Sequence, residues 1–165
     1  MSSPQRFHNT REECGVFLIN SRQEILLIHQ TNTNWRKWIL PSLIRRPPTR
    51  LEEQASQALV QLTNIESNPN DLIYLGISRH ASRREIFHGF LYRLTTPEQF
   101  SCRIQIEDPE EISPAYVAID AYRWLPPDRA INYLPKHQAD QLPLLVDYLV
   151  REQANQLITT QPQTK

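Results

Sequence analysis

The chain has 165 residues, which predicts one domain, and a chain of this length can bury about two thirds of its unfolded surface. Its 18 lysines and arginines balance 18 aspartates and glutamates, so the overall charge favours neither nucleic acid nor an anionic membrane as a partner. No apolar run approaches the length of about 18 residues that a membrane-spanning helix needs. We therefore expect no association with a membrane.

The polar ends of the chain set the expected domain boundaries. We expect a flexible tail at residues 1–11, one domain at residues 12–153 and a second flexible tail at residues 154–165, which are rich in Gln and Thr. The N-terminus has no apolar signal-peptide segment. Cys14 and Cys102 form no CxxC motif and are typical of thiols in a reducing compartment, with a single disulfide as the alternative. The expected location is cytoplasmic.

The first half of the chain predicts strands followed by a helix. The β-rich runs at 14–20 and 24–30 flank a polar turn and predict a hairpin or two adjacent strands. After a loop and a short extended segment that Pro41 ends, apolar residues recur every three or four positions and predict an amphipathic helix. Thr49 and Glu52 form an expected capping box at its start, and Asn64 is suited to the left-handed position at its end.

The second half predicts further strands and a C-terminal helix. The expected strands are 71–78 and 85–94, which pair as a hairpin around the basic sequence RHASRRE, and 116–126; a short helical turn and a helix follow at 128–134 and 137–157. An apolar stripe is expected on the last helix, with Pro143 in its first turn or at a kink. Its expected members are Leu142, Leu145, Val146 and Leu149. This order predicts an α+β protein with a mixed sheet and packed helices.

Residues 40–66, LPSLIRRPPTRLEEQASQALVQLTNIE, carry a resemblance to a known family. With the strands before and after it, this segment resembles a Nudix hydrolase domain over most of the chain, from about Glu13 to Val150. The Nudix box, G-x5-E-x7-R-E-U-x-E-E-x-G-U with U a bulky apolar residue, aligns with the segment without a gap. The resemblance implies an α/β/α sandwich with a mixed sheet.

The resemblance covers the length and spacing of the box but not its catalytic residues. The first Glu of the motif falls on Thr49, the Arg-Glu pair on Gln57 and Ala58, and the Glu-Glu pair on Gln61 and Leu62. In the family these carboxylates hold Mg²⁺ or Mn²⁺, which bridges a diphosphate and activates the attacking water. Neutral and apolar side chains supply too little charge for this task. We therefore expect no catalytic residue in the box, no metal site and no cofactor.

Two arginine-rich loops are the candidate binding region, because the planar guanidinium group matches phosphate. The alternative interpretation is a set of ordinary solvated loop charges. Trp35, in a polar loop, is a candidate ligand contact. The candidate ligand-binding residues are Arg45, Arg46, Arg50, Arg83, Arg84 and Trp35. In the acidic sequence EDPEE, Glu110 and Glu111 are candidate residual carboxylates, although a charged loop or docking surface is the simpler interpretation.

Three functions are consistent with this sequence. The leading hypothesis is a catalytically inactive Nudix-like domain that serves as a protein-interaction or regulatory module, or as a sensor of an anionic ligand such as a nucleotide. The alternative is an atypical metal-dependent hydrolase of nucleoside diphosphate derivatives that uses the acidic loop. The third is an RNA-binding module. The expected partner is a protein or a phosphate-bearing small molecule; nucleic acid is not favoured, and the sequence does not set the oligomeric state.

Overall fold

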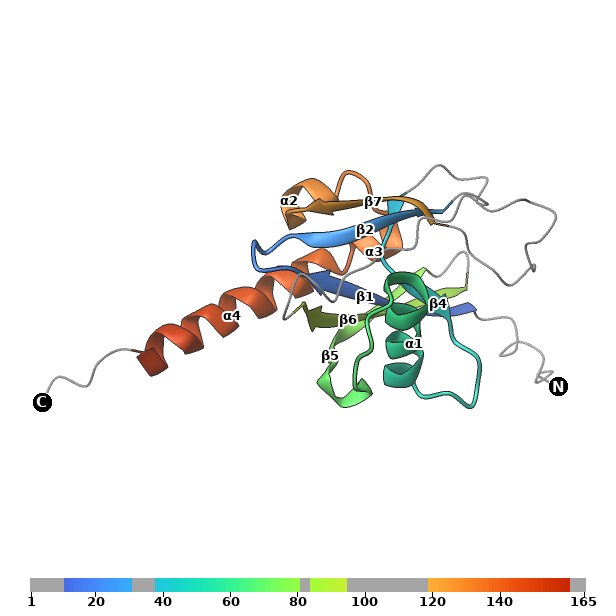
Figure 1. The fold of residues 1–165 in the computed structure, drawn as a ribbon, viewed down its shortest axis with the longest axis horizontal. Coiled ribbons are helices and arrows are strands. Elements are labelled where there is room, and N and C mark those ends of the chain that lie inside the picture. The colour runs from blue at the N-terminus through green and yellow to red at the C-terminus, as the bar shows by residue number, and fades with distance from the viewer. Residues whose placement is uncertain (1–10, 31–37, 81–83, 95–118, 161–165) are drawn as a thin grey trace, which may run out of the picture.

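The computed structural model describes residues 11–30, 38–80, 84–94 and 119–160 and has a mixed β-sheet with helices on both faces (Figure 1). The strands are β1 (Arg11–Ile19), β2 (Ile25–Gln30), β3 (Trp38–Ile39), β4 (Ser42–Ile44), β5 (Ile73–His80), β6 (Glu85–Arg93) and β7 (Ile119–Leu125). The helices are α1 (Leu51–Thr63), the 3₁₀ helix η2 (Pro69–Asp71), α2 (Pro127–Ala130), α3 (Lys136–Ala139) and α4 (Leu142–Thr160). The predicted fold class is confirmed.

The sheet combines the two predicted hairpins through one parallel pairing. Its order is β3-β2-β1-β6-β5, with β4 also paired to β1 and β7 to β2. The pairs β1–β2 and β5–β6 are antiparallel, as predicted. In the first hairpin, the Asn20 side chain accepts hydrogen bonds from the backbone N–H groups of Arg22 and Glu24, both at 3.0 Å. Strands β1 and β6 run parallel at the centre, so the sheet is mixed.

Alternation along β1 divides the core into two layers, because successive strand residues point to opposite faces. Cys14, Val16 and Leu18 belong to the apolar cluster that includes the buried residues of α1. Phe17 and Ile19 belong to the cluster on the other face, which includes residues of α4. Side chains on the two faces of β1 thus pack against α1 and α4, which gives the α/β/α arrangement.

Helix α1 begins differently from the prediction. It starts at Leu51 with Arg50 in the N-cap position, and no side chain caps it, so the predicted capping box is wrong. Thr49 instead lies in a turn, where its backbone N–H donates to the carbonyl of Arg46 at 3.0 Å. The end of α1 agrees with the prediction, since Asn64 is left-handed with φ 59° and its N–H donates to the Val60 carbonyl.

The three glycines of the chain lie side by side across the sheet. Gly15 of β1 pairs with Gly89 of β6, which pairs with Gly76 of β5. Gly76 has φ 156° at an irregularity of β5, a conformation that side chains rarely adopt. A Cβ atom at Gly89 would lie 2.7 Å from Oε1 of Gln141. Gly76 and Gly89 therefore let Gln141 and Leu144 approach the sheet closely.

The C-terminal region is two helices where one was predicted. Helices α3 and α4 are separated near Gln141, and Pro143 lies in the first turn of α4, as expected. Of the expected apolar stripe, Leu142 and Leu145 are buried, whereas Val146 is 42% exposed. The expected domain end at residue 153 lies within α4, which projects beyond the sheet (Figure 1). Among the described residues, no helix is long and apolar enough to cross a membrane.

Candidate functional site

The four helix positions that the box assigns to catalytic residues lie on two different surfaces of α1. Ala58 is fully buried and Leu62 is 5% exposed, and Leu62 packs in the same cluster as Cys14. Gln57 and Gln61 are exposed to solvent. The two box positions that face the sheet, Ala58 and Leu62, are therefore part of the apolar core.

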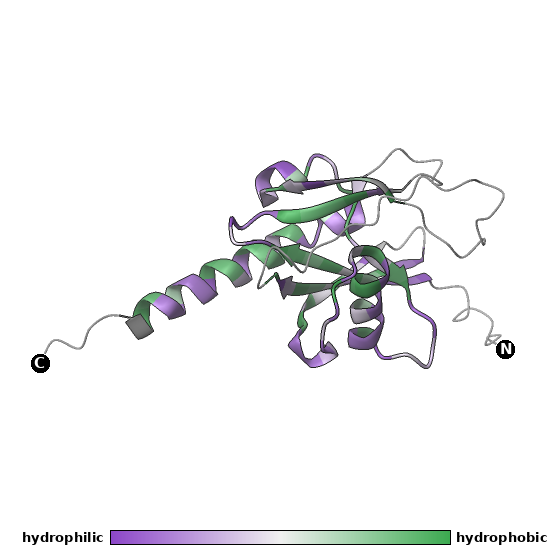
Figure 2. Ribbon diagram, in the orientation of Figure 1, coloured by the Kyte–Doolittle hydropathy of each residue, from purple (hydrophilic) through white to green (hydrophobic). Residues whose placement is uncertain are grey.

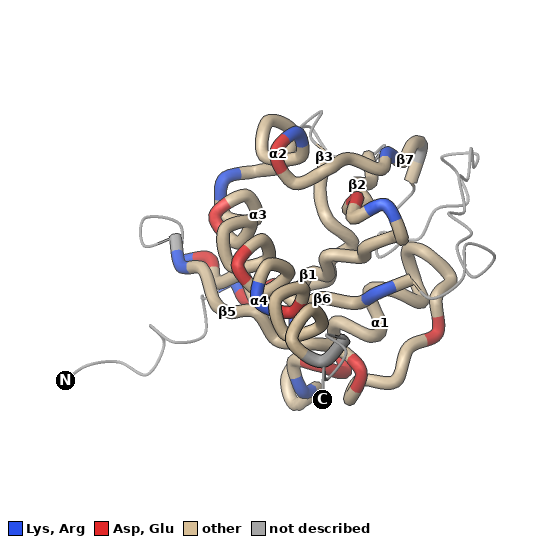
Figure 3. The backbone as a smooth tube through the Cα atoms, turned by 90° about the vertical axis from the view of Figure 1, so that its left-hand side faces the viewer, with Lys and Arg blue, Asp and Glu red and all other residues tan. Residues whose placement is uncertain are grey.

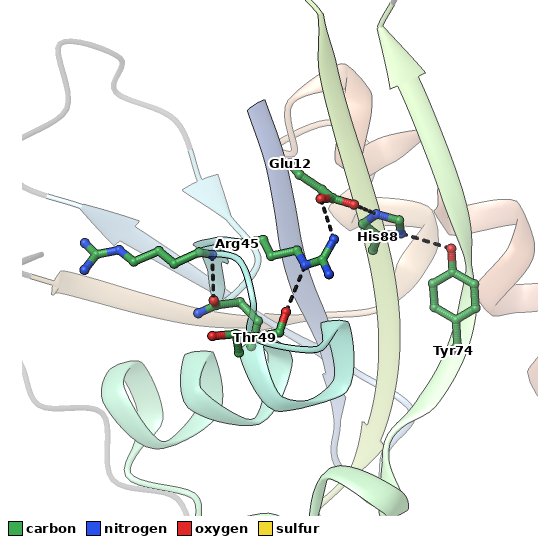
Figure 4. Close-up of polar contacts among 7 residues, drawn as sticks. Glu12, Arg45, Thr49, Tyr74 and His88 are labelled. Carbon is green, nitrogen blue, oxygen red and sulfur yellow. Dashed lines mark hydrogen bonds and ion pairs between the residues drawn. The ribbon is translucent and has the colours of Figure 1, made fainter. Parts of the chain in front are cut away.

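Glu12, at the start of β1, lies at the centre of a polar network on the α1 side of the sheet (Figure 4). Its carboxylate accepts a hydrogen bond from Nη1 of Arg45 at 2.9 Å, and its other oxygen lies 2.7 Å from Nε2 of His88. Nδ1 of His88 lies 3.0 Å from the hydroxyl of Tyr74. Nε of Arg45 also donates to the Thr49 carbonyl at 2.9 Å, which ties the loop before α1 to this network.

The pKa of Glu12 reflects these contacts. Burial acts to raise the pKa of this carboxyl, but hydrogen bonds and charge from Arg45 and His88 outweigh burial and hold it below the ordinary value. When Nε2–H of His88 donates to Glu12, Nδ1 accepts a hydrogen bond from the Tyr74 hydroxyl. The network therefore joins an exposed tyrosine on the edge strand β5 to an ionised carboxylate through a buried histidine.

Glu13 anchors a second network on the opposite face of the sheet. Its carboxylate accepts hydrogen bonds from Oγ of Ser42 at 2.6 Å and Nε2 of Gln138 at 3.2 Å, and it lies 3.2 Å from Nε2 of His137. Oε1 of Gln138 in turn accepts the backbone N–H of Leu40 at 2.9 Å. Burial acts to raise the pKa of Glu13, but the contacts with His137 and Ser42 outweigh it and lower the pKa. This network holds α3 on the sheet.

Neither network was among the predicted sites. His88 was expected only as a strand residue, which is confirmed, and Glu12, Glu13, His137 and Tyr74 were not singled out. The signal in the sequence was a pair of adjacent glutamates opening an otherwise apolar strand. Buried ends of apolar strands rarely carry unpaired carboxylates, so both side chains required partners.

The two arginine-rich loops lie on either side of the start of β1. The backbone N–H of Arg45 donates to the Glu12 carbonyl at 2.7 Å, and that of Arg11 donates to the Arg84 carbonyl at 3.0 Å. Because these bonds connect β1 to its neighbours on both sides, Arg45 and Arg84 lie at the same end of the sheet.

The predicted arginines differ in what surrounds them. Arg45 is engaged by Glu12 and Thr49, while the exposed Arg50 pairs with Glu53 at 3.2 Å. Arg46 and Arg84 are exposed, and neither forms an ion pair within the described part of the chain. The remaining candidates lie outside the described residues: Trp35, Arg83, Glu110 and Glu111.

Other reactive groups add little to this region. Burial raises the pKa of the free Cys14 thiol to about 12, so this thiol is protonated at neutral pH. Within the described ranges, no three or more His, Cys, Asp or Glu side chains are grouped so as to hold a metal ion. Basic and acidic residues are interspersed over the described chain (Figure 3), so any binding of an anion depends on a local arrangement.

A mixed sheet between helices, with α1 packed beside a loop at one end of the sheet, defines an α/β/α fold of the Nudix type. No protein-family model matches the sequence, and no curated protein matches it. The Nudix domain of Shewanella oneidensis NrtR, complexed with ADP ribose, is 16% identical with a TM-score of 0.64, covering 89% of this chain and 93% of that one.

Two further solved structures share this fold. An Ap4A hydrolase of C. elegans is 13% identical with a TM-score of 0.63, over 85% of this chain and 98% of that one. A MutT protein of Methanosarcina mazei is 18% identical with a TM-score of 0.60, over 87% of this chain and 94% of that one. The chain therefore has the Nudix fold, which is as far as similarity at this level of identity reaches.

Proposed function

We propose that this chain is a Nudix-fold binding domain that does not hydrolyse diphosphates and that acts as a regulatory module for an anionic, nucleotide-like ligand. The observation that carries the proposal is the burial of Ala58 and Leu62 at the two inward positions of α1. A divalent metal needs several oxygen ligands, preferably anionic ones. An alanine and a leucine packed in the core supply none, and Gln57 and Gln61 are neutral amides.

The two carboxylates at the start of β1, Glu12 and Glu13, already have partners. Both oxygens of Glu12 are taken by Arg45 and His88, and both oxygens of Glu13 have partners on the far face of the sheet. The cation that lies beside Glu12 is therefore the guanidinium group of Arg45. This arrangement leaves hydrolysis without its usual metal ligands.

The class of ligand is proposed from charge and from the fold. Arg46 and Arg84 are exposed at the same end of the sheet. The Nudix domain of Shewanella oneidensis NrtR was solved with ADP ribose, a ligand that carries a diphosphate. ADP-ribose is therefore the first ligand to test, and an acidic protein segment that meets the same arginines is the second.

The first expected result is an absence of turnover. With Mg²⁺ or Mn²⁺, the purified protein should release no product above background from ADP-ribose, dinucleoside polyphosphates or nucleoside triphosphates, because the box positions 57, 58, 61 and 62 of α1 carry no carboxylate for the metal. Product release is followed by chromatography. Metal-dependent turnover that disappears in Glu110→Gln or Glu111→Gln would overturn the proposal and favour the atypical hydrolase.

The second expected result concerns the arginines. Arg46→Glu and Arg84→Glu should each weaken ADP-ribose binding by about 1 kcal/mol, or roughly fivefold, at low salt. The loss should shrink near 1 M salt, where the Debye length is about 3 Å. Isothermal titration calorimetry measures both conditions.

A matched control for these reversals is Arg22→Glu, which makes the same charge change in the turn at the other end of β1. Binding that is equally sensitive to Arg22→Glu would mean that only net charge matters. Binding that survives both Arg46→Glu and Arg84→Glu would exclude this end of the sheet. Tighter binding of a short RNA than of ADP-ribose would instead favour the RNA-binding hypothesis.

A further inference from the structure

Helix α4 presents an apolar stripe that the described part of the chain leaves uncovered. Val146 is 42% exposed, Val150 59% and Leu157 62%, and Pro143 and Ala154 are also exposed. Figure 1 shows the second half of α4 projecting away from the sheet, and Figure 2 shows apolar residues continuing along it. At 3.6 residues per turn these five side chains fall within about 80° of the helix circumference.

The spacing of the stripe is symmetric about Val150. Its members, Pro143, Val146, Val150, Ala154 and Leu157, are separated by three, four, four and three residues. In an antiparallel copy of the helix related by a two-fold axis at Val150, Val150 meets itself, Val146 meets Ala154, and Pro143 meets Leu157. A two-fold interface requires this kind of self-complementary surface. The stripe is about 21 Å long.

The charges beside the stripe agree with the same arrangement. Asp147 and Arg151 lie along one side of it, 2.8 Å apart and largely exposed. With the two-fold axis at Val150, Asp147 lies about 3 Å along the helix axis from Arg151 of the second copy, and the reverse holds as well. Opposite charges therefore meet across the interface on both sides of the two-fold axis.

We propose that α4 is a dimerisation helix, on which a second copy of this chain packs its own α4 in an antiparallel, two-fold arrangement centred on Val150. A single helix pair buries less surface than the roughly 1,200 to 2,000 Å² of a stable interface. The dimer should therefore be weak and reversible, with a dissociation constant on the order of 10 to 100 μM.

Sedimentation velocity over a range of about 1 to 500 μM tests the proposal, since this range brackets the expected dissociation constant. The full chain should shift from monomer to dimer as its concentration rises. Val150→Glu should weaken the dimer about tenfold or more, because the two-fold axis brings two carboxylates together. The matched control is Val60→Glu, which places the same charge on an exposed apolar position of α1, 38% exposed, and should leave the dimer intact.

A charge exchange separates loss of the interface from loss of the helix. Asp147→Arg and Arg151→Asp should each weaken the dimer, and the double variant should restore it, with circular dichroism unchanged throughout. A wild-type chain that stays monomeric up to about 500 μM would overturn the proposal. So would Val150-dependent binding to vesicles of phosphatidylcholine and phosphatidylserine by a chain that forms no dimer, because the stripe would then be a membrane-surface contact.

Discussion

Replacing Leu62 with glutamate is expected to lower the free energy of unfolding by about 3 to 5 kcal/mol, because the change puts an unpaired carboxylate into the apolar core. Leu62 is 5% exposed and packs with Leu59, Cys14 and Phe90 between α1 and the sheet. The change restores one carboxylate of the family's box at its own position. If that position were still suited to a carboxylate, the substitution would be tolerated. Urea unfolding at neutral pH measures the difference.

The control for this prediction is Gln61→Glu, the neighbouring position of the same box. Gln61 is exposed, so a carboxylate there remains hydrated and should change stability by no more than about 0.5 kcal/mol. Burial raises the pKa of a carboxyl, so the defect of Leu62→Glu should shrink as the pH falls and the new side chain is protonated. Equal effects at residues 61 and 62 would mean that the wrong face of α1 is assigned to the core.

Local signals in the sequence were sufficient for the individual elements. The three- to four-residue spacing of Leu51, Ala55, Leu59 and Leu62 predicts α1. Polar turns between apolar runs predict the pairing of β1 with β2 and of β5 with β6. The start of α1 was less predictable. Thr49 and Glu52 have the spacing of a capping box, but the chain makes a turn between Arg46 and Thr49, and the helix begins one residue after that pattern requires.

Local sequence patterns could not predict the polar networks, because these networks depend on which strands become neighbours. Glu12 and His88 are 76 residues apart, and Glu13 and His137 are 124 residues apart. The parallel pairing of β1 with β6 brings the first pair together, and the packing of α3 on the other face brings the second. Periodicity predicts which face a residue takes on a strand, but not the partner it meets there.

The candidate arginines illustrate the same limit. A run of arginines indicates positive charge, but whether each one is available to a ligand depends on its neighbours in the fold. Arg45 is held by Glu12, whereas Arg46, the next residue, is exposed. The role of these arginines in binding stays a prediction, and the contrast between Arg45 and Arg46 decides which of them to change first.

Removing Glu13 is expected to cost about 2 to 4 kcal/mol of stability, because its carboxylate is the shared partner of three side chains in the packed layer between β1 and α3. In Glu13→Ala, the donors of Ser42, Gln138 and His137 lose this partner together. Glu53→Ala is the control, since Glu53 is an exposed carboxylate whose pairing with Arg50 should be worth no more than about 1 kcal/mol. Chemical unfolding of both variants gives the comparison.

The pH dependence of the same carboxylates has a definite sign. The pKa values of Glu12 and Glu13 are both lowered from 4.5 in the folded chain, so the folded state binds fewer protons than the unfolded state over that range. Their contribution to stability should be fully present above about pH 4.5 and should be lost as the pH falls through the folded pKa values. Glu13→Gln removes one of the two titrating groups and keeps most of the volume of the side chain. Its free energy of unfolding should therefore fall less steeply on acidification than that of the wild-type chain, and parallel acid limbs in the two unfolding curves would show that Glu13 is not a source of the pH dependence.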